Sequence, residues 1–352
     1  MRNRQQYIHL SSLAGQSNIT SSKLQCKCGI PQGSCLGPLL FLFFINDLTK
    51  ATDFFTLLFA DDCTFQISGS NSLSVINRAN EELMKARQWF CANKLTINAK
   101  KTKYILYKDP VSHIHVNNLY IGNSSITRVG RYCAEKSVRF LGIWVDDTLS
   151  FSSHISKLKS KLVSGIYALS TSSKLVSLKV RKLIYRSLVE SHIRFASIIY
   201  GASNSNLISD IRVLQRKAIR IVAKAKYNAH TSELFKEYSF LKFDDIVHLN
   251  QTIFVRQFKN KQLPTSFLNF FQDLPLSQQI YRDHDYNLKP KQVNKTFLSH
   301  YPTVKMIRAW NQNDLLIKSE AEVADLKEYF MMHKLNSYES ECLEVNCYIC
   351  NH

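Results

Sequence analysis

The sequence predicts an α+β chain: a small antiparallel sheet with helices, then a helical middle region and a mostly helical last region. Residues 1–149 hold short apolar runs between turn residues, which is typical of antiparallel strands and hairpins. In residues 150–228, apolar residues recur every three or four positions, which is typical of amphipathic helices. Residues 229–352 mix short helical patterns with loops punctuated by prolines. With 352 residues, 45% of them hydrophobic, the chain can bury a core in about two or three units.

The first region begins with extended segments at residues 6–10 and 23–28. A loop with glycine and proline follows at residues 29–37, and residues 39–48 predict the start of a buried helix. Two apolar runs, 54–60 and 63–67, flank an acidic pair. This pattern predicts a β-hairpin with the acids at its tip.

A broad apolar face predicts a helix over residues 72–93, closed by Asn93. Strands are expected at residues 104–107 and 138–145, and the turn signals between them predict another hairpin within 109–136.

Three helices are predicted in the middle region. The first contains apolar residues three or four positions apart, and the second and third cover about 178–200 and 207–224. In the last region Trp310 is predicted to be a packing residue. The apolar positions of the first helix are Ile155, Leu158, Leu162, Ile166 and Leu169.

The net charge is concentrated in the middle of the chain. Lys and Arg number 46 against 27 Asp and Glu, a formal net charge of +19. Residues 150–228 alone carry a net charge of +13, whereas residues 229–352 carry −1. Such a charge indicates a polyanionic partner, either nucleic acid or an anionic membrane surface.

Basic residues follow one face of the third predicted helix, where steps of four drift only about 40° per step. Such a stripe can follow a sugar–phosphate backbone, although a solvated helical surface that happens to be basic is the alternative. The candidate backbone contacts are Lys157, Lys161, Arg212, Arg216, Lys217, Arg220 and Lys224.

The cellular location follows from two further features. No secretory signal is expected, since residues 1–6 are polar and no apolar core follows them. The longest apolar runs, 39–45 and 54–60, are shorter than the roughly 20 residues that span a bilayer, so membrane insertion is not expected. We expect an intracellular protein, in the nucleus or the cytoplasm, whose oligomeric state the sequence leaves open.

The chain has nine cysteines, an odd number that fits reduced thiols in an intracellular protein. Cys342, Cys347, Cys350 and His352 lie close together near the end of the chain. Zinc accepts such ligands, but the second pair of ligands in a zinc site normally lies a dozen or more residues from the first, so a free tail is the expectation and a zinc site the alternative.

The adjacent carboxylates Asp61 and Asp62 are the clearest candidates for chemistry. Hard oxygen ligands suit Mg²⁺, which typically takes one or two carboxylates together with substrate phosphates. The alternative is a solvent-exposed turn, because Asp is a common turn residue. In a chain with a phosphate-tracking basic segment, the pair indicates metal-assisted phosphoryl transfer on nucleic acid.

Several motifs resemble those of reverse transcriptases, in the same order and spacing. Phe59-Ala60-Asp61-Asp62 resembles the F/Y-A-D-D box of these enzymes. Upstream, the segment from Gly29 to Phe41 resembles their second palm motif, and Ile45-Asn46-Asp47-Leu48 resembles the end of that motif.

The resemblance continues downstream and is closest to non-LTR (LINE-like, jockey-type) retrotransposon enzymes. Trp89, Asn93-Lys94-Leu95 and Asn98-x-x-Lys101-Thr102 resemble the fourth motif, Phe140-Leu141-Gly142 with Asp146 resembles the primer-grip region, and the segment from His154 to Arg220 resembles the thumb. The resemblance implies a partial right-hand palm in 1–149, a basic helical thumb in 150–228 and a helical and loop region in 229–352.

The resemblance also implies roles for individual residues. Asp61, with Asp62 as its companion, would hold catalytic Mg²⁺, which Mn²⁺ could replace, and Lys101 would stand near the triphosphate. Leu141 and Gly142 would support the primer end. The implied partners are an RNA template, a DNA primer and deoxynucleoside triphosphates. The pocket for template and incoming nucleotide would be lined by Pro31, Gln32 and Gly33.

One part of the family pattern has no counterpart. In the family an aspartate-bearing motif precedes this region, and no acidic residue occurs before Asp47. We therefore expect an N-terminally truncated copy that is inactive by itself as a polymerase. A non-catalytic nucleic-acid-binding remnant is the alternative. A membrane-surface protein is a third reading, but it needs an apolar helix face that is free for lipid.

Overall fold

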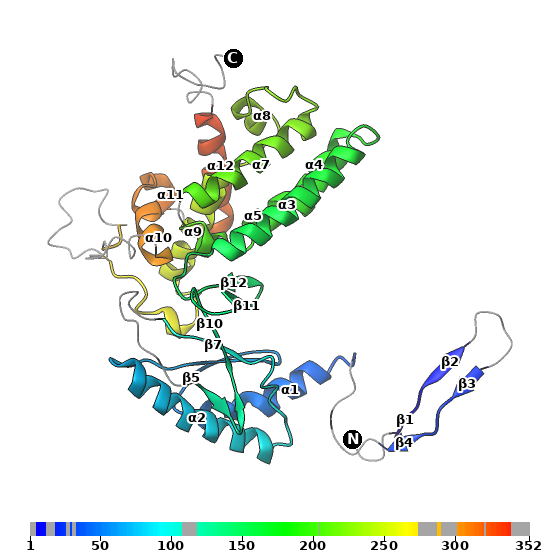
Figure 1. The fold of residues 1–352 in the computed structure, drawn as a ribbon. Coiled ribbons are helices and arrows are strands. Elements are labelled where there is room, and N and C mark those ends of the chain that lie inside the picture. Colours follow the sequence, from blue (N-terminus) through cyan, green and yellow to red (C-terminus); the bar gives the residue numbers. More distant parts are fainter. Residues whose placement is uncertain are drawn as a thin grey trace. The chain divides into compact units, whose positions relative to one another are not determined.

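The computed structural model describes residues 5–11, 18–25, 29, 33–107, 118–203, 205–273, 287–289, 301–319 and 322–338 (Figure 1). The chain forms two compact units. Residues 1–104 and 108–128 make the first unit, and residues 105–107 and 129–352 make the second. Mixed helices and small antiparallel strands confirm the α+β prediction. In the part of the chain that the structure describes, no helix combines the length and apolarity needed to cross a membrane.

An antiparallel hairpin opens the first unit, and it confirms the predicted extended segments where they are described. In the strand pair nearer the turn, His9 lies opposite Thr20. In the strand pair farther from the turn, Gln6 lies opposite Leu24. The strands are β1 (Gln5–Gln6), β2 (His9–Ser11), β3 (Asn18–Thr20) and β4 (Leu24–Gln25).

The next element is helix α1 (Gly37–Ile45), which a 3₁₀ turn, η1 (Asn46–Lys50), extends. The helix is confirmed, but its predicted burial is wrong, because only Gly37 and Ile45 are buried within it. The sequence of α1 is apolar on every side, whereas only one side packs against the rest of the unit, through Ile45 and Phe90. The exposed apolar side chains at this helix are Leu36, Leu39, Leu40, Leu42, Phe43 and Phe44.

Strands β5 (Phe55–Phe59) and β6 (Asp62–Gln66) form the predicted acidic hairpin, with Phe59 paired to Asp62. Alternation along β5 sends Thr56 and Leu58 inward and leaves Phe55, Leu57 and Phe59 exposed. The outer face of this hairpin is therefore apolar along β5, whereas β6 places Asp62, Thr64 and Gln66 beside these residues on the same face.

Helix α2 (Ser72–Ala92) confirms the helix predicted over 72–93. Its first turn is capped by Asn71, whose Oδ1 accepts a hydrogen bond from the Leu73 backbone N–H at 2.8 Å. The buried face of α2 packs against Phe54 and the strands near it through Ile76, Ala79 and Leu83.

Short strands complete the sheet-forming part of the chain. The strand predicted at 104–107 is confirmed as β7, and the hairpin predicted within 109–136 is confirmed in its described part as β8 and β9. The strand predicted over 138–145 is instead a hairpin of β11 and β12. The bounds are β7 (Lys103–Ile105), which pairs with β10 (Thr127–Val129), β8 (Tyr120–Ile121), β9 (Ser124–Ser125), β11 (Val138–Phe140) and β12 (Ile143–Val145).

The second unit confirms two of the three predicted basic helices, α3 (Ser152–Ser172) and α7 (Ser205–Ala223). The helix predicted over 178–200 is interrupted twice. A π-helical segment widens it, and a break follows at Ala196, whose φ is +53°. The pieces are α4 (Leu178–Tyr185), η2 (Arg186–Glu190), α5 (Ser191–Arg194) and α6 (Ser197–Tyr200).

Gly165 explains how η2 fits against α3. A Cβ atom at position 165 would lie 2.5 Å from the backbone oxygen of Leu188 and 3.1 Å from its Cβ. Only a residue without a side chain leaves room for the π-helical backbone to approach this closely.

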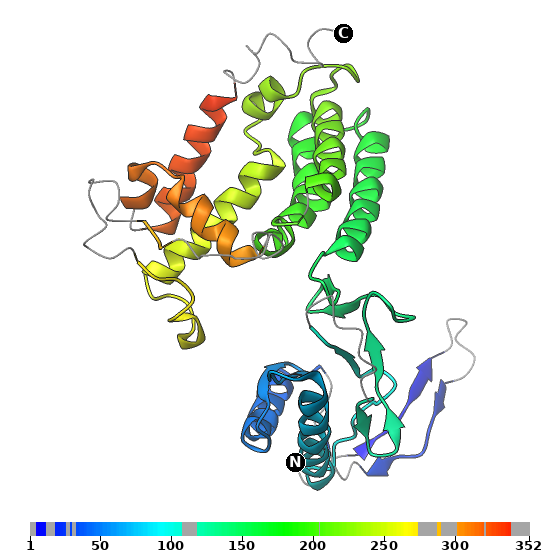
Figure 2. The same cartoon turned by 60° about the vertical axis from the view of Figure 1, so that its left-hand side comes forward.

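Helix α9 (Phe243–Lys259) lies between the basic helices and the last helices of the chain (Figure 2). Its buried side chains join one core with those of α3 and α7. Trp310 is fully buried, which confirms its predicted packing role. The remaining elements are α8 (Ser232–Glu237), η3 (Thr265–Phe267), α10 (Pro302–Asn311), α11 (Leu315–Ser319) and α12 (Val323–Ser337).

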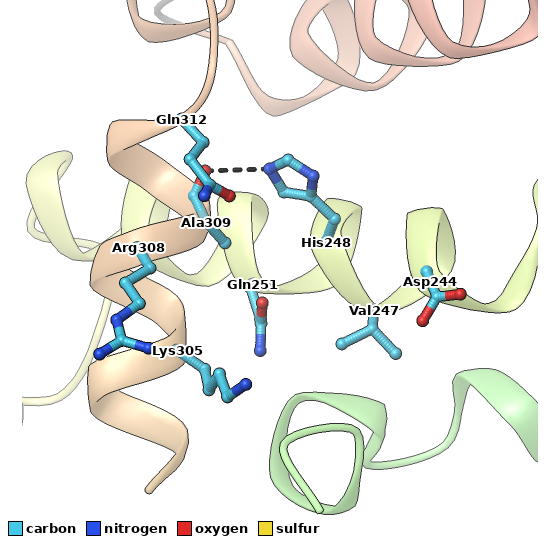
Figure 3. Close-up of a pocket in the computed structure, with 8 residues that line it drawn as sticks. All are labelled: Asp244, Val247, His248, Gln251, Lys305, Arg308, Ala309 and Gln312. Atoms are coloured by element: carbon cyan, nitrogen blue, oxygen red, sulfur yellow. Dashed lines mark hydrogen bonds between the residues drawn. The ribbon is translucent and has the colours of Figure 1, made fainter. Parts of the chain in front are cut away.

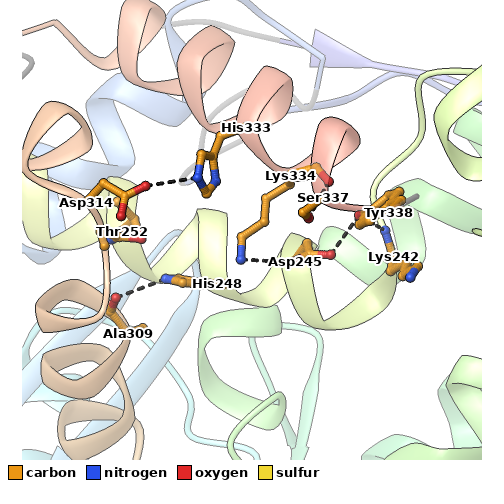
Figure 4. A network of polar contacts seen from close by, with 11 residues as sticks. Lys242, Asp245, His248, Thr252, Ala309, Asp314, His333, Lys334, Ser337 and Tyr338 are labelled. Atoms are coloured by element: carbon orange, nitrogen blue, oxygen red, sulfur yellow. Dashed lines mark hydrogen bonds and ion pairs between the residues drawn. The ribbon is translucent and has the colours of Figure 1, made fainter. Parts of the chain in front are cut away.

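Polar contacts fasten α9 to the end of α12 (Figure 4). The Tyr338 hydroxyl donates to Asp245 Oδ2 at 2.7 Å and accepts from the Lys242 backbone N–H at 3.0 Å. Lys334 Nζ lies 3.6 Å from Asp245 Oδ1. These contacts fix the orientation of α9 relative to α12.

Candidate active site and nucleic-acid interface

The acidic pair lies at the tip of the β5–β6 hairpin. Asp61 occupies the turn and Asp62 begins β6, and both side chains are exposed. The turn needs a left-handed backbone at Ala60, whose φ is +52°. The two carboxylates therefore point into solvent, where a hydrated divalent cation can reach them without displacing protein atoms.

Next to this pair, burial raises the pKa of the Cys63 thiol, and the negative charges of Asp62 and Asp61 raise it further. The thiol therefore stays protonated at neutral pH and is a poor nucleophile. The raised pKa of Cys63 also indicates that the two aspartates make the electrostatic potential at the tip negative.

The oxygen donors of Asp61 and Asp62 fit Mg²⁺ or Mn²⁺ in kind. Two adjacent carboxylates are typical of part of a magnesium site. Within the described ranges, no group of three or more His, Cys, Asp and Glu side chains gathers around a common point. The tip therefore presents the two carboxylates of Asp61 and Asp62 as its candidate metal ligands.

Gly33 lies in the loop before α1, with φ +80°, and no heavy atom lies within 4 Å of the position of a Cβ atom there. Backbone at this point is therefore accessible to a ligand, and its left-handed conformation favours glycine. Pro31 and Gln32, the other two predicted pocket residues, lie outside the described residues, as do Cys342, Cys347, Cys350 and His352.

Lys101 stands on a turn built by its own motif. The Asn98 carbonyl accepts hydrogen bonds from the backbone N–H groups of Lys101 and Thr102 at 3.1 and 3.0 Å, and from the Thr102 hydroxyl at 3.0 Å. Asn98 and Thr102 therefore shape the turn, and the Lys101 side chain is exposed on it.

The upstream part of the same motif ends helix α2. Asn93 Nδ2 donates to the Trp89 carbonyl at 2.9 Å, Lys94 takes a left-handed conformation with φ +56°, and the Leu95 N–H bonds to the Phe90 carbonyl at 2.8 Å. These contacts satisfy carbonyl groups at the helix end. The motif residues here are thus explained by the helix terminus.

Leu141 and Gly142 form the tip of the β11–β12 hairpin in the second unit. Both have positive φ, +44° and +91°, as a two-residue turn of type I′ requires. Leu141 is exposed, and a Cβ atom on Gly142 would lie 2.9 Å from the Phe195 ring. The tip therefore packs Gly142 close to Phe195 and presents Leu141 to solvent.

Asp146 has a role that the sequence did not indicate. Its buried carboxylate accepts hydrogen bonds from the backbone and hydroxyl of Thr148, from those of Ser150 and from the Phe151 backbone, at 2.6–3.0 Å. Leu149 and Phe151 both have positive φ in this loop. Asp146 therefore holds a strained connection at the start of α3. The spacing of Asp with Thr and Ser two and four residues later was the available signal.

The predicted phosphate contacts divide into engaged and free cations. Arg212 makes a bidentate ion pair with Asp244, at 2.8 Å for both nitrogens, and Arg220 Nε donates to the Ala229 carbonyl at 2.9 Å. Lys157 lies over the Trp144 ring at 5.8 Å. No hydrogen bond or ion pair joins the following cations to another described side chain: Lys161, Arg216, Lys217 and Lys224.

Burial lowers the pKa of Arg220, and the neighbouring positive charge of Arg216 adds to this effect. The two guanidinium groups are thus close enough to repel each other. An anion placed between them would relieve that repulsion, which is the property expected of a phosphate-binding surface.

The structure places the predicted residues on both units. Asp61, Asp62, Gly33 and Lys101 lie on the first unit. Leu141, Gly142 and every predicted backbone contact lie on the second.

Comparison with known families defines the class of protein. Residues 3–145 match the family "Reverse transcriptase (RNA-dependent DNA polymerase)". This range contains the acidic hairpin, the Gly33 loop, the Lys101 turn and the β11–β12 tip. The similarity to the reverse transcriptase family therefore covers residues 3–145, the part of the chain that carries these motifs.

The curated relatives identify the kind of element. The chain is 25% identical over 229 residues to the RNA-directed DNA polymerase from mobile element jockey of Drosophila melanogaster. This match covers 62% of the chain and 24% of the relative. The chain is 23% identical over 231 residues to the jockey protein of Drosophila funebris, with the same coverage. It is 22% identical over 236 residues to the probable polymerase from transposon X-element of Drosophila melanogaster, over 64% of this chain and 25% of the relative.

These relatives are non-LTR retrotransposon polymerases, as the sequence motifs predicted. The chain spans about a quarter of their length. No solved structure matches the chain.

Proposed function

We propose that this chain is part of an RNA-directed DNA polymerase, comprising a portion of the palm in residues 1–149 and the thumb in residues 150–228. The observation that carries the proposal is the β5–β6 hairpin, which displays Asp61 and Asp62 at an open tip inside the family match. Asp61, with Asp62 beside it, would hold Mg²⁺ or Mn²⁺. When bound there, such ions would supply Lewis-acid chemistry for activating a primer 3′-hydroxyl and stabilising the leaving pyrophosphate.

The other predicted residues position substrates in this proposal. Gly33, with Pro31 and Gln32, lines the place of the template base and the incoming deoxynucleoside triphosphate, and accessible backbone at Gly33 supports this role. Lys101 lies on its turn in reach of solvent, as a lysine that contacts a triphosphate must.

The β11–β12 tip is the proposed support for the primer end. Its two-residue turn leaves Leu141 exposed, and this side chain offers an apolar contact surface. The RNA template and DNA primer would form the duplex that the basic helices hold through its backbone, without reading sequence.

Free and engaged cations of α7 are expected to differ in their contribution to duplex binding. The double substitution Arg216→Gln, Lys217→Gln should weaken binding of an RNA–DNA hybrid by about tenfold, and it should reduce the slope of log K against log salt by about two, one for each phosphate that is no longer neutralised. The double substitution Arg212→Gln, Asp244→Asn removes an ion pair and leaves the net charge unchanged, so a much smaller change is expected. Fluorescence anisotropy over a salt series measures both quantities, and equal effects of the two variants would contradict the proposed thumb surface.

By itself the chain is expected to extend no primer. Two exposed carboxylates at one hairpin tip position a metal poorly, and poor positioning of reacting groups removes most of the rate enhancement. The test is primer extension on a homopolymer RNA template with Mg²⁺ and then Mn²⁺. Incorporation above that of the Asp61→Ala variant would show that the chain is active as it stands.

A non-catalytic nucleic-acid-binding remnant is the second candidate, and the openness of the Asp61 and Asp62 tip favours it. Such a remnant should bind the duplex with steep salt dependence and show no metal-dependent binding of deoxynucleoside triphosphates. Titration of a fluorescent triphosphate with Mn²⁺, with and without duplex, separates the two functions. Binding that requires Mn²⁺ and is lost in Asp61→Ala would support the polymerase.

A further inference from the structure

A polar depression lies between α9 and α10 in the second unit (Figure 3). Its volume is about 330 Å³, at the lower end of ligand sites, which are roughly 300–1,000 Å³. The region that contains it has a net charge of −1 and holds none of the predicted phosphate contacts. The lining residues are Asp244, Val247, His248, Gln251, Lys305, Arg308, Ala309 and Gln312.

Gln251 is the first unusual member of this lining. The residue is only 5% exposed, and its side chain extends from α9 into the depression, toward Lys305 (Figure 3). The structure records no hydrogen bond from its amide to any described residue. The amide atoms of Gln251 are not among the fully buried, unpaired side-chain atoms of the described residues, so they are in contact with the solvent of the depression. The amide of Gln251 is therefore available to a ligand.

Two cations share the depression with this amide. Lys305 and Arg308 lie one turn apart on α10, and the structure records no ion pair or hydrogen bond from either side chain to another described residue. Lysine and arginine beside a free amide donor are the groups that bind a phosphate.

The remaining charged groups leave the depression positive. Asp244 is the one carboxylate of the lining, and Arg212 neutralises it through two hydrogen bonds of 2.8 Å. Burial lowers the pKa of His248, and its Nε2 contacts the Ala309 carbonyl at 2.9 Å, so the ring is neutral at pH 7. Asp245, the nearby acid of α9, faces Tyr338 and Lys334 on the other side.

We infer that this depression binds a backbone phosphate of nucleic acid, with Lys305 and Arg308 supplying charge and Gln251 a fixed hydrogen bond. The inference rests on the proposed function, and it extends the contact surface beyond the basic helices into the last region. Arg212 connects the two, because it belongs to the α7 stripe and pairs with a residue of the depression.

Three variants of the full chain test the inference against a fluorescent RNA–DNA hybrid in a salt series. Lys305→Gln with Arg308→Gln should weaken binding about tenfold and lower the salt slope by up to about two. Gln251→Leu should weaken binding about threefold and leave the slope unchanged, because it removes a hydrogen bond and no charge. Lys327→Gln is the matched control, since Lys327 is an exposed lysine on α12.

The outcomes separate this inference from the function on which it rests. If the wild-type chain binds the hybrid, and Arg216→Gln, Lys217→Gln weakens it, while the α10 double variant behaves like Lys327→Gln, the inference is overturned and the proposed function stands. If the wild-type chain binds no hybrid, the proposed function fails as well.

A separate arm with inorganic phosphate distinguishes a free anion from a backbone phosphate. Phosphate that raises the thermal midpoint of the wild-type chain but not of the α10 double variant, with hybrid affinity equal in both, would assign the depression to a free anion and overturn the backbone contact. Since the α10 substitutions lie at partly exposed positions, a far-UV spectrum like that of the wild type is expected for them.

Discussion

Gly165→Val is expected to lower the free energy of unfolding by about 3 kcal/mol, with Gly165→Ala lowering it by about half as much. The reason is steric. The first added carbon would lie 2.5 Å from the Leu188 backbone oxygen, and a backbone atom in a π-helical turn cannot move aside as a flexible side chain can. The higher helix propensity of alanine, roughly 1 kcal/mol relative to glycine, offsets part of the clash in that variant only.

Urea unfolding followed by circular dichroism measures this effect. Ser164→Ala is the matched control, because Ser164 is the neighbouring residue of α3 and is exposed. Its hydroxyl donates only to the Ser160 carbonyl of the same helix. Unfolding midpoints of the control and Gly165→Val that coincide would show that α3 and η2 do not pack as described.

Asp146→Ala should cost about 3 kcal/mol of stability, a loss similar to that expected for Gly165→Val. Removing the carboxylate leaves the backbone N–H groups of Thr148, Ser150 and Phe151 without their acceptor, in a loop where two residues hold left-handed conformations. Asp146→Asn keeps one acceptor oxygen and should lose about half as much. Urea unfolding at pH 7 gives both values. If Asp146→Ala lowered the free energy of unfolding by less than about 0.5 kcal/mol, the role of Asp146 as a loop anchor would be contradicted.

The same residue makes stability depend on pH. Burial acts to raise the pKa of Asp146, but the hydrogen bonds from Thr148 and Ser150 outweigh it, and the pKa lies below its ordinary value. A carboxyl with a lower pKa in the folded state than in the unfolded state stabilises the fold above the unfolded value, about 3.9. That stability is lost as the pH falls from there through the folded pKa. The difference in stability between the wild type and Asp146→Asn should therefore shrink on acidification, and a constant difference would refute the assignment.

How much of the fold the sequence predicts depends on whether the pattern is local. Periodic apolar residues are enough to place α2, α3 and α7, since a helix face needs only its own positions to be recognised. The break at Ala196 carries no such signal, because no glycine or proline marks it. For helix α1 the local pattern is misleading. Its entirely apolar sequence indicates burial, but neighbouring elements leave most of the helix uncovered.

In the candidate site, too, the sequence predicts the features that depend on a local pattern and misses those that depend on distant residues. The hairpin that displays Asp61 and Asp62 follows from two apolar runs around an acidic pair, and it was predicted. Which cations are free was not predictable, because the partners of Arg212 and Arg220 lie beyond α7, at Asp244 and Ala229. Gln251 carries no sequence signal at all, because its lack of a partner among the described residues is a property of two packed helices.

The outward apolar side chains of α1 and β5 govern how the chain behaves in solution. Phe43 is 73% exposed and Phe59 64%, and β5 and β6 form a sheet of only two described strands, so each has an unpaired edge. Two chains that meet through these surfaces remove them from water, and their charge of +19 opposes the encounter. Salt screens that repulsion and leaves the apolar attraction intact. High salt, which would also weaken the proposed binding of nucleic acid to the basic helices, is therefore the condition under which we expect self-association to be most favoured.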